Sequence, residues 1–199
     1  MIKFKNIEKS EPYEQFSNFY EKALTRNQDF PYSFCISSYD KNSEEVDSRF
    51  VNLKYIIENE WVFFSNYNSK KANSFETHNQ IAANFFWSSI FVQIRIKGKI
   101  FKTNKDFSDK HFKNRKLEKN ALAISSDQSA PIESFSMVKK KYLEELSSKE
   151  SLKKRPNYWG GFSFIPYYFE FWEGDQNRLN KRTSFIQDGK SWKKIFLQP

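Results

Sequence analysis

The segments Ser48-Arg49-Phe50-Val51-Asn52-Leu53-Lys54 and Phe63-Phe64-Ser65-Asn66-Tyr67-Asn68-Ser69-Lys70-Lys71 are the part of the sequence on which the fold prediction depends. Each contains an apolar run of the length of a short strand. Basic or hydroxyl side chains stand at the ends of both runs. We therefore expect strands at 49–57 and 61–66, followed by a short helix from Ser69 to about Thr77.

The rest of the chain alternates between strand-like and helix-like patterns. Val92 to Lys97 alternates apolar and polar residues, which is the period of a half-buried strand. Further strands are expected at 32–39, 81–87, 161–165, 168–172, 183–187 and 192–196, and helices at 11–25, 105–115 and 117–125. A longer helix is expected after Ser129, with Pro131 in its first turn. Its inward stripe is expected to be Ile132, Phe135, Val138 and Tyr142.

These elements predict an α+β protein with a mainly antiparallel sheet and peripheral helices. Because there is no internal repeat or linker, residues 1–199 are expected to form a single domain, with residues 1–10 disordered. The polar stretch 147–155 is expected to be exposed. Phe occurs 22 times, which predicts a core built on aromatic rings.

Composition limits the compartment and the partners. No apolar run approaches the roughly 18 residues of a membrane span, and the first residues lack the apolar core of a signal peptide. The single cysteine, Cys35, fits a reducing compartment. We therefore expect a cytoplasmic protein with no membrane partner.

A net charge of +9 raises the question of nucleic-acid binding. The longest basic run, Lys139 to Lys141, is followed by Glu144 and Glu145, as on a solvated helix face with internal charge pairing. We expect no nucleic-acid partner.

Several common catalytic and binding motifs are absent. The five glycines form neither a GxGxxG nor a P-loop pattern, and two histidines with one cysteine give no metal-ligand spacing. A phosphate ligand would therefore need Arg, Lys and hydroxyl side chains, such as Arg49, Lys70 and Lys71. The spacing of Lys70 and Lys71 alone favours ordinary surface lysines. No metal is expected.

A wider set of motifs changes that interpretation. In order along the chain they are Gln93, Gln128-Ser129, Trp159-Gly160-Gly161-Phe162, Glu170-Phe171-Trp172-Glu173-Gly174 and Arg178-Leu179-Asn180-Lys181-Arg182. Together with the two opening segments, this set resembles the pyridoxamine 5'-phosphate oxidase family from about Glu11 to Pro199. The resemblance implies an FMN-binding split β-barrel of the Greek-key type. It also implies a homodimer with FMN at the subunit interface, where both subunits line each site.

The resemblance assigns cofactor contacts by position. The FMN phosphate is expected on Arg49, Lys70 and Lys71, where Lys70 replaces a family arginine and so lacks the bidentate fork. The other FMN contacts are expected from Phe64, Ser65, Gln93, Gln128, Ser129, Trp172 and Arg182. Ser129 has a second interpretation as the cap of the helix that follows it.

The resemblance also assigns the substrate site. Lys54, Arg115 and Arg178 match family residues that bind the substrate, and Arg178 is the expected catalytic residue beside the substrate ring. The chain departs from the family at four positions, where His111 replaces a tyrosine, Lys119 a serine, Asn180 a histidine and Lys181 an aspartate. His111, Lys119 and Asn180 remain substrate-binding candidates in a pocket of altered shape.

The implied activity is oxidation of pyridoxamine or pyridoxine 5'-phosphate. A hydride passes from the substrate carbon to flavin N5, and O2 then takes up the electrons, so that the products are an aldehyde and H2O2. Two alternatives stay open. The first is a related phenazine-pathway flavin oxidoreductase that acts on a different acidic ring substrate. The second is a non-catalytic protein that binds FMN or pyridoxal phosphate.

Overall fold

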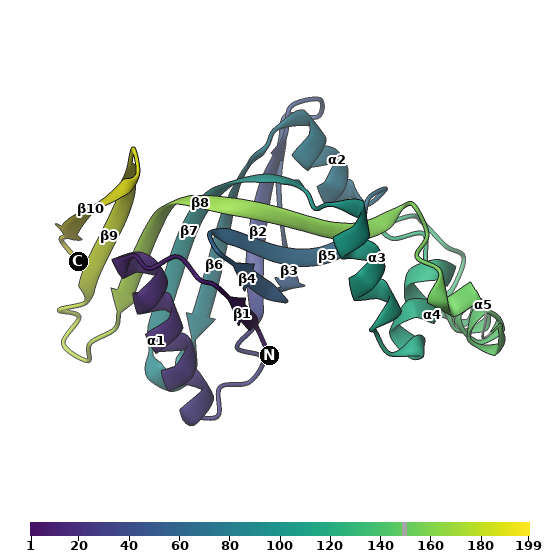
Figure 1. The fold of residues 1–199 in the computed structure, drawn as a ribbon, viewed down its shortest axis with the longest axis horizontal. Coiled ribbons are helices and arrows are strands. Elements are labelled where there is room, and N and C mark those ends of the chain that lie inside the picture. The colour runs from purple at the N-terminus through teal and green to yellow at the C-terminus, as the bar shows by residue number, and fades with distance from the viewer. Residues whose placement is uncertain (149–150) are drawn as a thin grey trace.

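Ten strands form one mainly antiparallel sheet in the computed structural model, which describes residues 1–148 and 151–199 (Figure 1). The order along the sheet is β1-β4-β5-β8-β7-β6-β2-β3, and β9 extends from β8 and carries β10. The strands are β1 (Lys3–Lys5), β2 (Ser33–Asp40), β3 (Glu45–Asn52), β4 (Tyr55–Ile57), β5 (Glu60–Asn66), β6 (Gln80–Trp87), β7 (Val92–Lys102), β8 (Trp159–Glu173), β9 (Lys181–Asp188) and β10 (Ser191–Leu197). The pair β1–β4 is parallel, and the other pairs are antiparallel.

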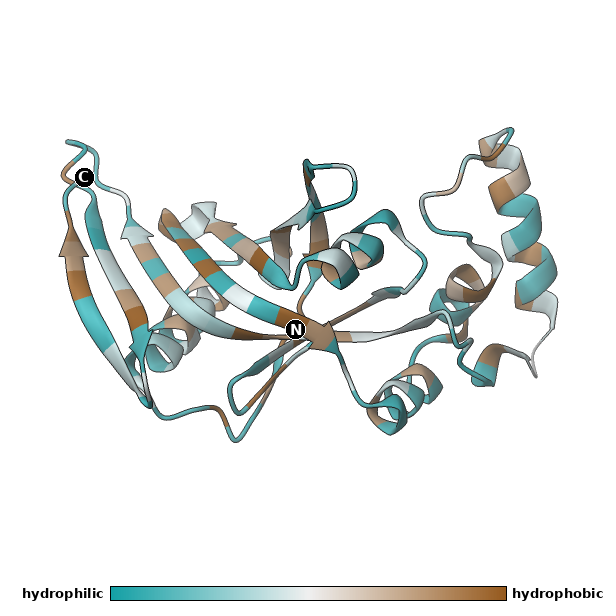
Figure 2. Ribbon diagram, turned by 90° about the horizontal axis from the view of Figure 1, so that it is seen from above, coloured by the Kyte–Doolittle hydropathy of each residue, from teal (hydrophilic) through white to brown (hydrophobic). Residues whose placement is uncertain are grey.

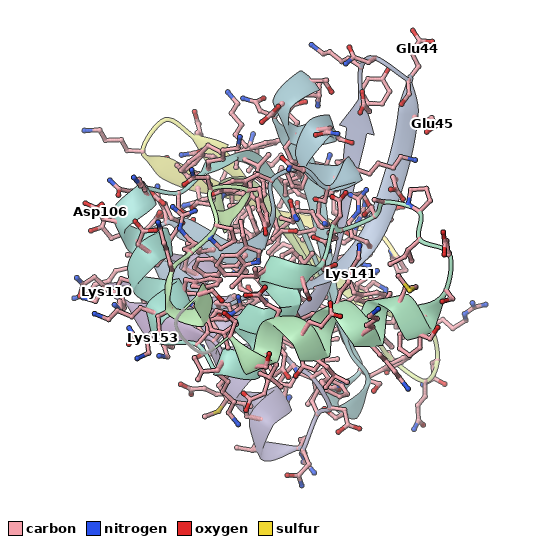
Figure 3. The ribbon with its side chains drawn as sticks, turned by 90° about the vertical axis from the view of Figure 1, so that its right-hand side faces the viewer. Glu44, Glu45, Asp106, Lys110, Lys141 and Lys153 are labelled. Atoms are coloured by element: carbon pink, nitrogen blue, oxygen red, sulfur yellow. The ribbon has the colours of Figure 1, made fainter. Side chains whose placement is uncertain are left out.

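Five α-helices surround the sheet. They are α1 (Glu11–Thr25), α2 (Lys70–Thr77), α3 (Lys105–Lys113), α4 (Leu117–Ser125) and α5 (Phe135–Ser147), with two short 3-10 helices at Ser88–Ile90 and Ser151–Lys153. Asn104 caps α3 by accepting a hydrogen bond from the Asp106 backbone N–H. Helix α3 turns Phe112 into the protein and its charged residues Asp106 and Lys110 outward (Figure 3).

Strand β8 runs along most of the molecule and separates two ends. One end carries α3, α4 and α5, and the other carries the β9–β10 hairpin and the C-terminus (Figure 1). Helix α5 lies at the far edge of the first end, beside α4 and away from the sheet (Figure 1 and Figure 2). Residues predicted to bind FMN and substrate are found at both ends.

The core consists mainly of aromatic rings, as predicted. Phe16 on α1 is fully buried, and its ring centroid lies 4.4 Å from Trp61, 5.4 Å from Phe85 and 5.5 Å from Trp87. The pairs with Trp61 and Phe85 are edge to face, and such pairs add stabilisation to the burial of apolar area. The contacts fix α1 against strands β5 and β6 of the sheet.

Two strand predictions need correction. The expected strand 49–57 is divided into β3 and β4 because the chain turns at Leu53, whose N–H bonds to Tyr32 O, and at Lys54, whose N–H bonds to Val62 O. The expected strands 161–165 and 168–172 are instead one strand, β8. A register shift at Lys97/Gly98 accommodates Pro166, which has no N–H for the ladder.

The start of the chain also differs from the expectation of disorder over residues 1–10. Ile2 is 6% exposed, and its N–H donates to the Tyr20 hydroxyl. Lys3–Lys5 pair with Tyr55–Ile57. The start of the chain is held by the burial of Ile2 and by the pairing of β1 with β4. Both depend on residues distant in sequence, so the local pattern does not reveal them.

The predicted helix after Ser129 begins later and buries less of its apolar stripe than expected. Helix α5 starts at Phe135, and Ser134 is its cap. Pro131 precedes the helix, and Phe135 is 71% exposed. The predicted stripe is only partly confirmed, because Val138 and Tyr142 are half-buried whereas Ile132 and Phe135 are exposed. Helix α5 contacts α4 rather than the sheet, and none of its residues is fully buried. In the polar stretch 147–155, residues 149–150 lie outside the described residues, and Leu152 is fully buried.

Over the residues that the structure describes, none of the helices has the length and apolarity to cross a membrane.

Candidate active site

A cavity of about 810 Å³ opens between β3, β5, the first turn of α2, and helices α3 and α4. It brings together eleven of the residues predicted from the sequence, namely Arg49, Lys54, Phe64, Ser65, Lys70, Lys71, His111, Arg115, Lys119, Gln128 and Ser129. Its charged lining is strongly basic, because Lys116 joins these cations and Asp47 is the one carboxylate residue that lines it among those described. Such a cavity favours an anionic ligand.

Arg49, Lys70 and Lys71 form the first basic group, which we call the α2 cluster. Lys71 Nζ donates to Ser65 Oγ and Ser69 Oγ, both at 3.0 Å. Arg49 Nη1 donates to Ser38 Oγ at 2.8 Å, and Arg49 Nη2 lies 2.7 Å from Asp47 Oδ2. Lys70 is exposed and pairs with Glu45 at 3.3 Å, at the tip of the β2–β3 hairpin (Figure 3). The cluster lies at the N-terminus of α2, where the helix dipole also favours an anion.

Burial makes Lys71 the unusual member of the α2 cluster. It is 7% exposed, and burial together with the nearby Arg49 lowers its pKa to about 8, although Asp47 opposes this shift. Its hydrogen-bond partners among the described residues are neutral hydroxyls. A bound phosphate would supply the negative charge that this buried ammonium group lacks.

Gln128 and Ser129 reach the cavity from the segment between α4 and α5. Gln128 Oε1 accepts hydrogen bonds from Ser65 Oγ at 3.2 Å and from the Asn66 N–H at 3.3 Å. Ser129 has a φ of +77°, in a region that non-glycine residues rarely occupy. Because Ser134 caps α5, the interpretation of Ser129 as a helix cap is wrong. Strained backbone beside a cavity is typical of binding sites.

Lys54, Arg115 and Lys119 form the second basic group, which we call the α3–α4 cluster. The Arg115 guanidinium lies over the Trp159 ring, 4.3 Å from its centroid, and Nη2 donates to Lys119 O at 3.2 Å. Arg115 Nη1 is buried and has no hydrogen-bond partner among the described residues. Burial, followed by Lys119 and Arg115, lowers the pKa of Lys54. Among the described residues, no carboxylate pairs with Lys54, Arg115 or Lys119.

An aromatic wall joins the two clusters. The His111 ring stacks on Phe64 with centroids 3.6 Å apart and planes at 9°, and Phe64 also stacks on Trp159 at 5.3 Å. His111 Nδ1 lies 2.9 Å from the Tyr55 hydroxyl oxygen. Burial, followed by Arg115, Lys54 and Lys3, lowers the pKa of His111 to about 3. The imidazole is therefore neutral across the physiological range.

The remaining predicted residues lie at the other end of the sheet, and we call them the strand-end group. Gln93 on β7 pairs with Trp172 on β8, which pairs with Arg182 on β9. Arg178 and Asn180 lie in the loop between β8 and β9. Asn180 Oδ1 accepts from the Asp175 N–H at 3.1 Å, and Arg178 has a φ of +63°. The cavity does not include these five residues of the same chain.

Glu170 organises the strand-end group and was not among the predicted site residues. It is 3% exposed, and its Oε1 accepts from Arg182 Nη2 at 2.8 Å and Nε at 3.1 Å. Its Oε2 accepts from Arg95 and Tyr168. Burial alone would raise the pKa of Glu170, but these hydrogen bonds and the two guanidinium charges outweigh burial and lower it. Glu170 therefore holds Arg182 in place as a carboxylate.

Other lining residues also escaped the sequence interpretation. Trp159 was quoted from the sequence as part of a motif and not as a site residue, yet it is buried, lines the cavity and lies under the Arg115 guanidinium. Asp47 and Lys116 also line the cavity and lie near predicted residues in sequence, and Asp47 shares a strand face with Arg49 because they are two residues apart. Tyr55 is not a lining residue, but it contacts His111, which lines the cavity. The glycines after Trp159 serve close packing, since a Cβ on Gly160 would lie 2.1 Å from the Tyr67 hydroxyl oxygen.

The residues present fit an FMN phosphate. The α2 cluster combines three cations, two hydroxyls and a helix N-terminus around a buried ammonium group with a lowered pKa. Phe64, the amide of Gln128 and the hydroxyl of Ser129 add an aromatic surface and polar groups suited to a flavin ring and its ribityl chain.

Comparisons with known proteins agree with this geometry. Residues 159–199 match the family description "Pyridoxine 5'-phosphate oxidase C-terminal dimerisation region". The chain is 34% identical over 192 residues to the pyridoxine/pyridoxamine 5'-phosphate oxidase of Bombyx mori, covering 94% of this chain and 74% of that one. It is also 34% identical over 190 residues to the enzyme of that name from Haemophilus influenzae, covering 94% and 89%.

Solved structures share the fold. The PhzG protein of Burkholderia lata, in complex with tetrahydrophenazine-1-carboxylic acid, superposes with a TM-score of 0.90 at 23% identity, covering 96% of this chain and 93% of that one. A pyridoxamine 5'-phosphate oxidase-related, FMN-binding protein of Nostoc punctiforme gives a TM-score of 0.73 at 11% identity, covering 92% and 97%. The fold is the predicted FMN-binding split barrel, and the chain belongs to the pyridoxine/pyridoxamine 5'-phosphate oxidase family of FMN-dependent oxidoreductases.

Proposed function

We propose that this protein oxidises pyridoxamine or pyridoxine 5'-phosphate as a homodimer with FMN at the subunit interface. The observation that carries the proposal is the presence of two separate basic clusters in one cavity, joined by the aromatic wall of Phe64 and His111. A flavin phosphate and a phosphorylated ring substrate need two anion sites with a flat apolar surface between them.

The α2 cluster would hold the FMN phosphate. Lys71 is already positioned by Ser65 and Ser69, and Arg49 by Ser38, so little side-chain entropy is lost when the phosphate binds. When bound, FMN supplies the hydride acceptor, and O2 then takes up the two electrons as H2O2.

The α3–α4 cluster would hold the substrate phosphate. Arg115 is fixed on the Trp159 ring, and its unbonded Nη1 can donate to a phosphate oxygen. Lys54 and Lys119 add charge, and His111 adds a neutral donor. These groups would orient the substrate ring over the flavin and keep it there during hydride transfer.

The distance along β8 supports a site shared between two subunits. Trp159 lines the cavity, and Trp172 follows thirteen residues later in the same strand. At about 3.3 Å per residue, the strand path between them is roughly 40 Å, which is much longer than one FMN molecule. The matched dimerisation region includes both residues. In the proposed dimer, the strand-end group of one subunit completes the cavity of the other.

This arrangement gives roles to Arg178 and Asn180. The exposed loop between β8 and β9 would bring Arg178 to the substrate ring in the facing cavity, where its guanidinium would orient the ring against the flavin. Asn180 would stand beside it as a neutral hydrogen-bonding group.

A second candidate is a flavin oxidoreductase of the phenazine-pathway type. Asn180 in place of histidine and Lys119 in place of serine alter the substrate pocket in this chain. The PhzG structure, which shares the fold, holds a ring carboxylic acid. A carboxylate could use the same α3–α4 cluster. Retention of Lys54, Arg115 and Arg178 favours the phosphorylated substrate.

Anaerobic mixing tests the proposal. Protein loaded with FMN is expected to lose its visible flavin absorbance when pyridoxamine 5'-phosphate is added without oxygen, and to release H2O2 when air is admitted. Bleaching by a dihydrophenazine carboxylic acid alone would support the second candidate. Binding of pyridoxal phosphate with no bleaching by either compound would identify a non-catalytic binding protein.

A further inference from the structure

Tyr55 and His111 form a hydrogen-bonded pair at the wall of the cavity. Their polar atoms, Oη and Nδ1, lie 2.9 Å apart, and their rings meet edge to face with centroids 5.5 Å apart. Tyr55 comes from β4, directly after Lys54, and His111 comes from α3. Stacking on Phe64 fixes the plane of the imidazole. The pair therefore links the sheet to α3 through an oriented imidazole.

The relative strengths of imidazole and phenol as hydrogen-bond acceptors and donors predict which atoms of Tyr55 and His111 carry the protons. An imidazole nitrogen is a far stronger acceptor than a phenol oxygen, and a phenol O–H is a good donor. The favoured arrangement has the Tyr55 hydroxyl donating to Nδ1. The single proton of a neutral imidazole then resides on Nε2. Among the residues that the structure describes, Nε2 has no hydrogen-bond partner, while the His111 ring lines the cavity.

The charged surroundings disfavour a second proton on the imidazole. Lys3 on β1, Lys54 before β4 and Arg115 after α3 face His111, and Tyr55 on β4 contacts it through a hydroxyl that burial keeps protonated. None of these four groups carries a negative charge that would stabilise an imidazolium. A neutral ring in this place can still donate through Nε2–H.

We propose that Tyr55 is a positioning residue, which holds His111 in the Nε2–H tautomer so that its N–H donates to the anionic group of the substrate between Lys54 and Arg115. This inference rests on the proposed function, since it names how that substrate site recognises an oxygen anion. It assigns a role to Tyr55, and it makes the Tyr55–His111 hydrogen bond a determinant of the affinity for substrate.

Nitrogen-15 NMR of imidazole-labelled protein tests the tautomer directly. The two histidines, His78 and His111, are distinguished with the His111→Gln variant. The wild type is expected to show His111 with a bare Nδ1 and a protonated Nε2. Tyr55→Phe is expected to give a mixture of tautomers. A wild-type His111 with its proton on Nδ1, or an unchanged tautomer in Tyr55→Phe, would overturn the inference.

Substrate affinity supplies the second measurement. Tyr55→Phe in the FMN-loaded protein is expected to raise KM for pyridoxamine 5'-phosphate about 3- to 10-fold, the effect of a misplaced donor, with little change in kcat. Tyr158→Phe is the matched control, because it also removes one hydroxyl hydrogen bond, to Ile124 O at 2.8 Å, from a residue that does not line this cavity. Equal KM values in Tyr55→Phe and Tyr158→Phe would contradict the role of Tyr55.

The two experiments separate this inference from the proposed function. If wild-type protein neither binds nor oxidises pyridoxamine 5'-phosphate, the proposed function fails, and with it the substrate contact of His111. The NMR result does not require any substrate, so it decides the Tyr55–His111 pair independently.

Discussion

The ammonium nitrogen of Lys71 lies 3.0 Å from the hydroxyl oxygen of Ser65, in a wall of the cavity that solvent hardly reaches. This contact joins the first turn of α2 to the end of β5. A buried cation bonded to neutral hydroxyls destabilises the ligand-free protein, because its lost hydration is not replaced by a negative charge. The same hydrogen bond holds the Lys71 ammonium group in position to bind an anion.

Replacement of Lys71 by methionine is expected to weaken FMN binding about 10- to 100-fold, the usual contribution of one charge-assisted hydrogen bond. The FMN-free variant is expected to be as stable as the wild type or more stable, since a buried charge is removed. Fluorescence titration with FMN and thermal unfolding without it give both quantities. Lys102→Met is the control, because Lys102 is half exposed and pairs with Glu76 outside the cavity. Equal losses of affinity in both variants would contradict the role of Lys71.

FMN affinity is expected to fall as pH rises through about 8, the lowered pKa of Lys71. In the FMN-free protein the folded-state pKa lies below the unfolded value of 10.5, so the unfolded chain binds more protons between these values and stability rises with pH there. Binding follows the opposite trend because the phosphate needs the protonated amine. Titrations at several pH values should show this decline, and Lys71→Arg should remove it, since arginine keeps its charge. A decline of the same size in Lys71→Arg would assign it to another group.

Glu170→Gln is expected to destabilise the protein by about 2–3 kcal/mol at pH 7, less than a fully buried ion pair, because Arg95 is half exposed and Arg182 is partly exposed. The lowered pKa of Glu170 means that its contribution is complete above its unfolded value of about 4.5 and is lost as pH falls through the lower folded-state value. Urea unfolding between pH 3 and pH 7 should therefore show a smaller loss on acidification in the variant. Glu173→Gln, which breaks an exposed pair with Lys181, is the control.

A mixture of two defective subunits tests the shared site. Lys71→Met damages the cavity, and Gln93→Leu damages the strand-end group. If each FMN site takes one part from each subunit, a heterodimer contains one intact site and one doubly defective site, so random mixing restores about a quarter of all sites. Flavin binding by the mixture, after the subunits are allowed to exchange, is compared with each variant alone. Heterodimers can be isolated with two different tags. If they show no recovery of FMN binding, the cavity and the strand-end group of one FMN site belong to the same subunit.

Asn180→His is expected to raise kcat/KM for pyridoxamine 5'-phosphate roughly 3- to 10-fold, equivalent to about 1 kcal/mol of transition-state stabilisation. The reason is that histidine restores a group that can carry a proton beside Arg178. The substitution also removes the acceptor of the Asp175 N–H, so Asn180→Ala serves as the control for the altered loop. Initial rates of H2O2 formation provide the measurement. A gain for a ring carboxylic acid in place of the phosphate ester would favour the second candidate.

The sequence by itself determined the family, the order of most elements and the identity of the cations. Each of these can be read from local sequence: alternation of apolar and polar residues marks β7, an apolar stripe marks α1, and Arg49, Lys70 and Lys71 are basic residue types. The absence of glycine-rich loops already predicted that side chains would have to bind a phosphate. The division of 49–57 was missed because it depends on hydrogen bonds with distant residues. The start of α5 at Phe135 was missed although a local cap, Ser134, marks it.

Only the tertiary structure decided which predicted residues share a cavity and in what protonation state they are. Lys70 and Lys71 are neighbours in sequence, yet one is exposed and the other buried, because successive residues of a helix face different sides. The lowered pKa values of Lys71 and His111 arise from burial, which no local pattern encodes. The separation of the strand-end group from the cavity follows from the length of β8, since residues in one extended strand move apart by about 3.3 Å at each step.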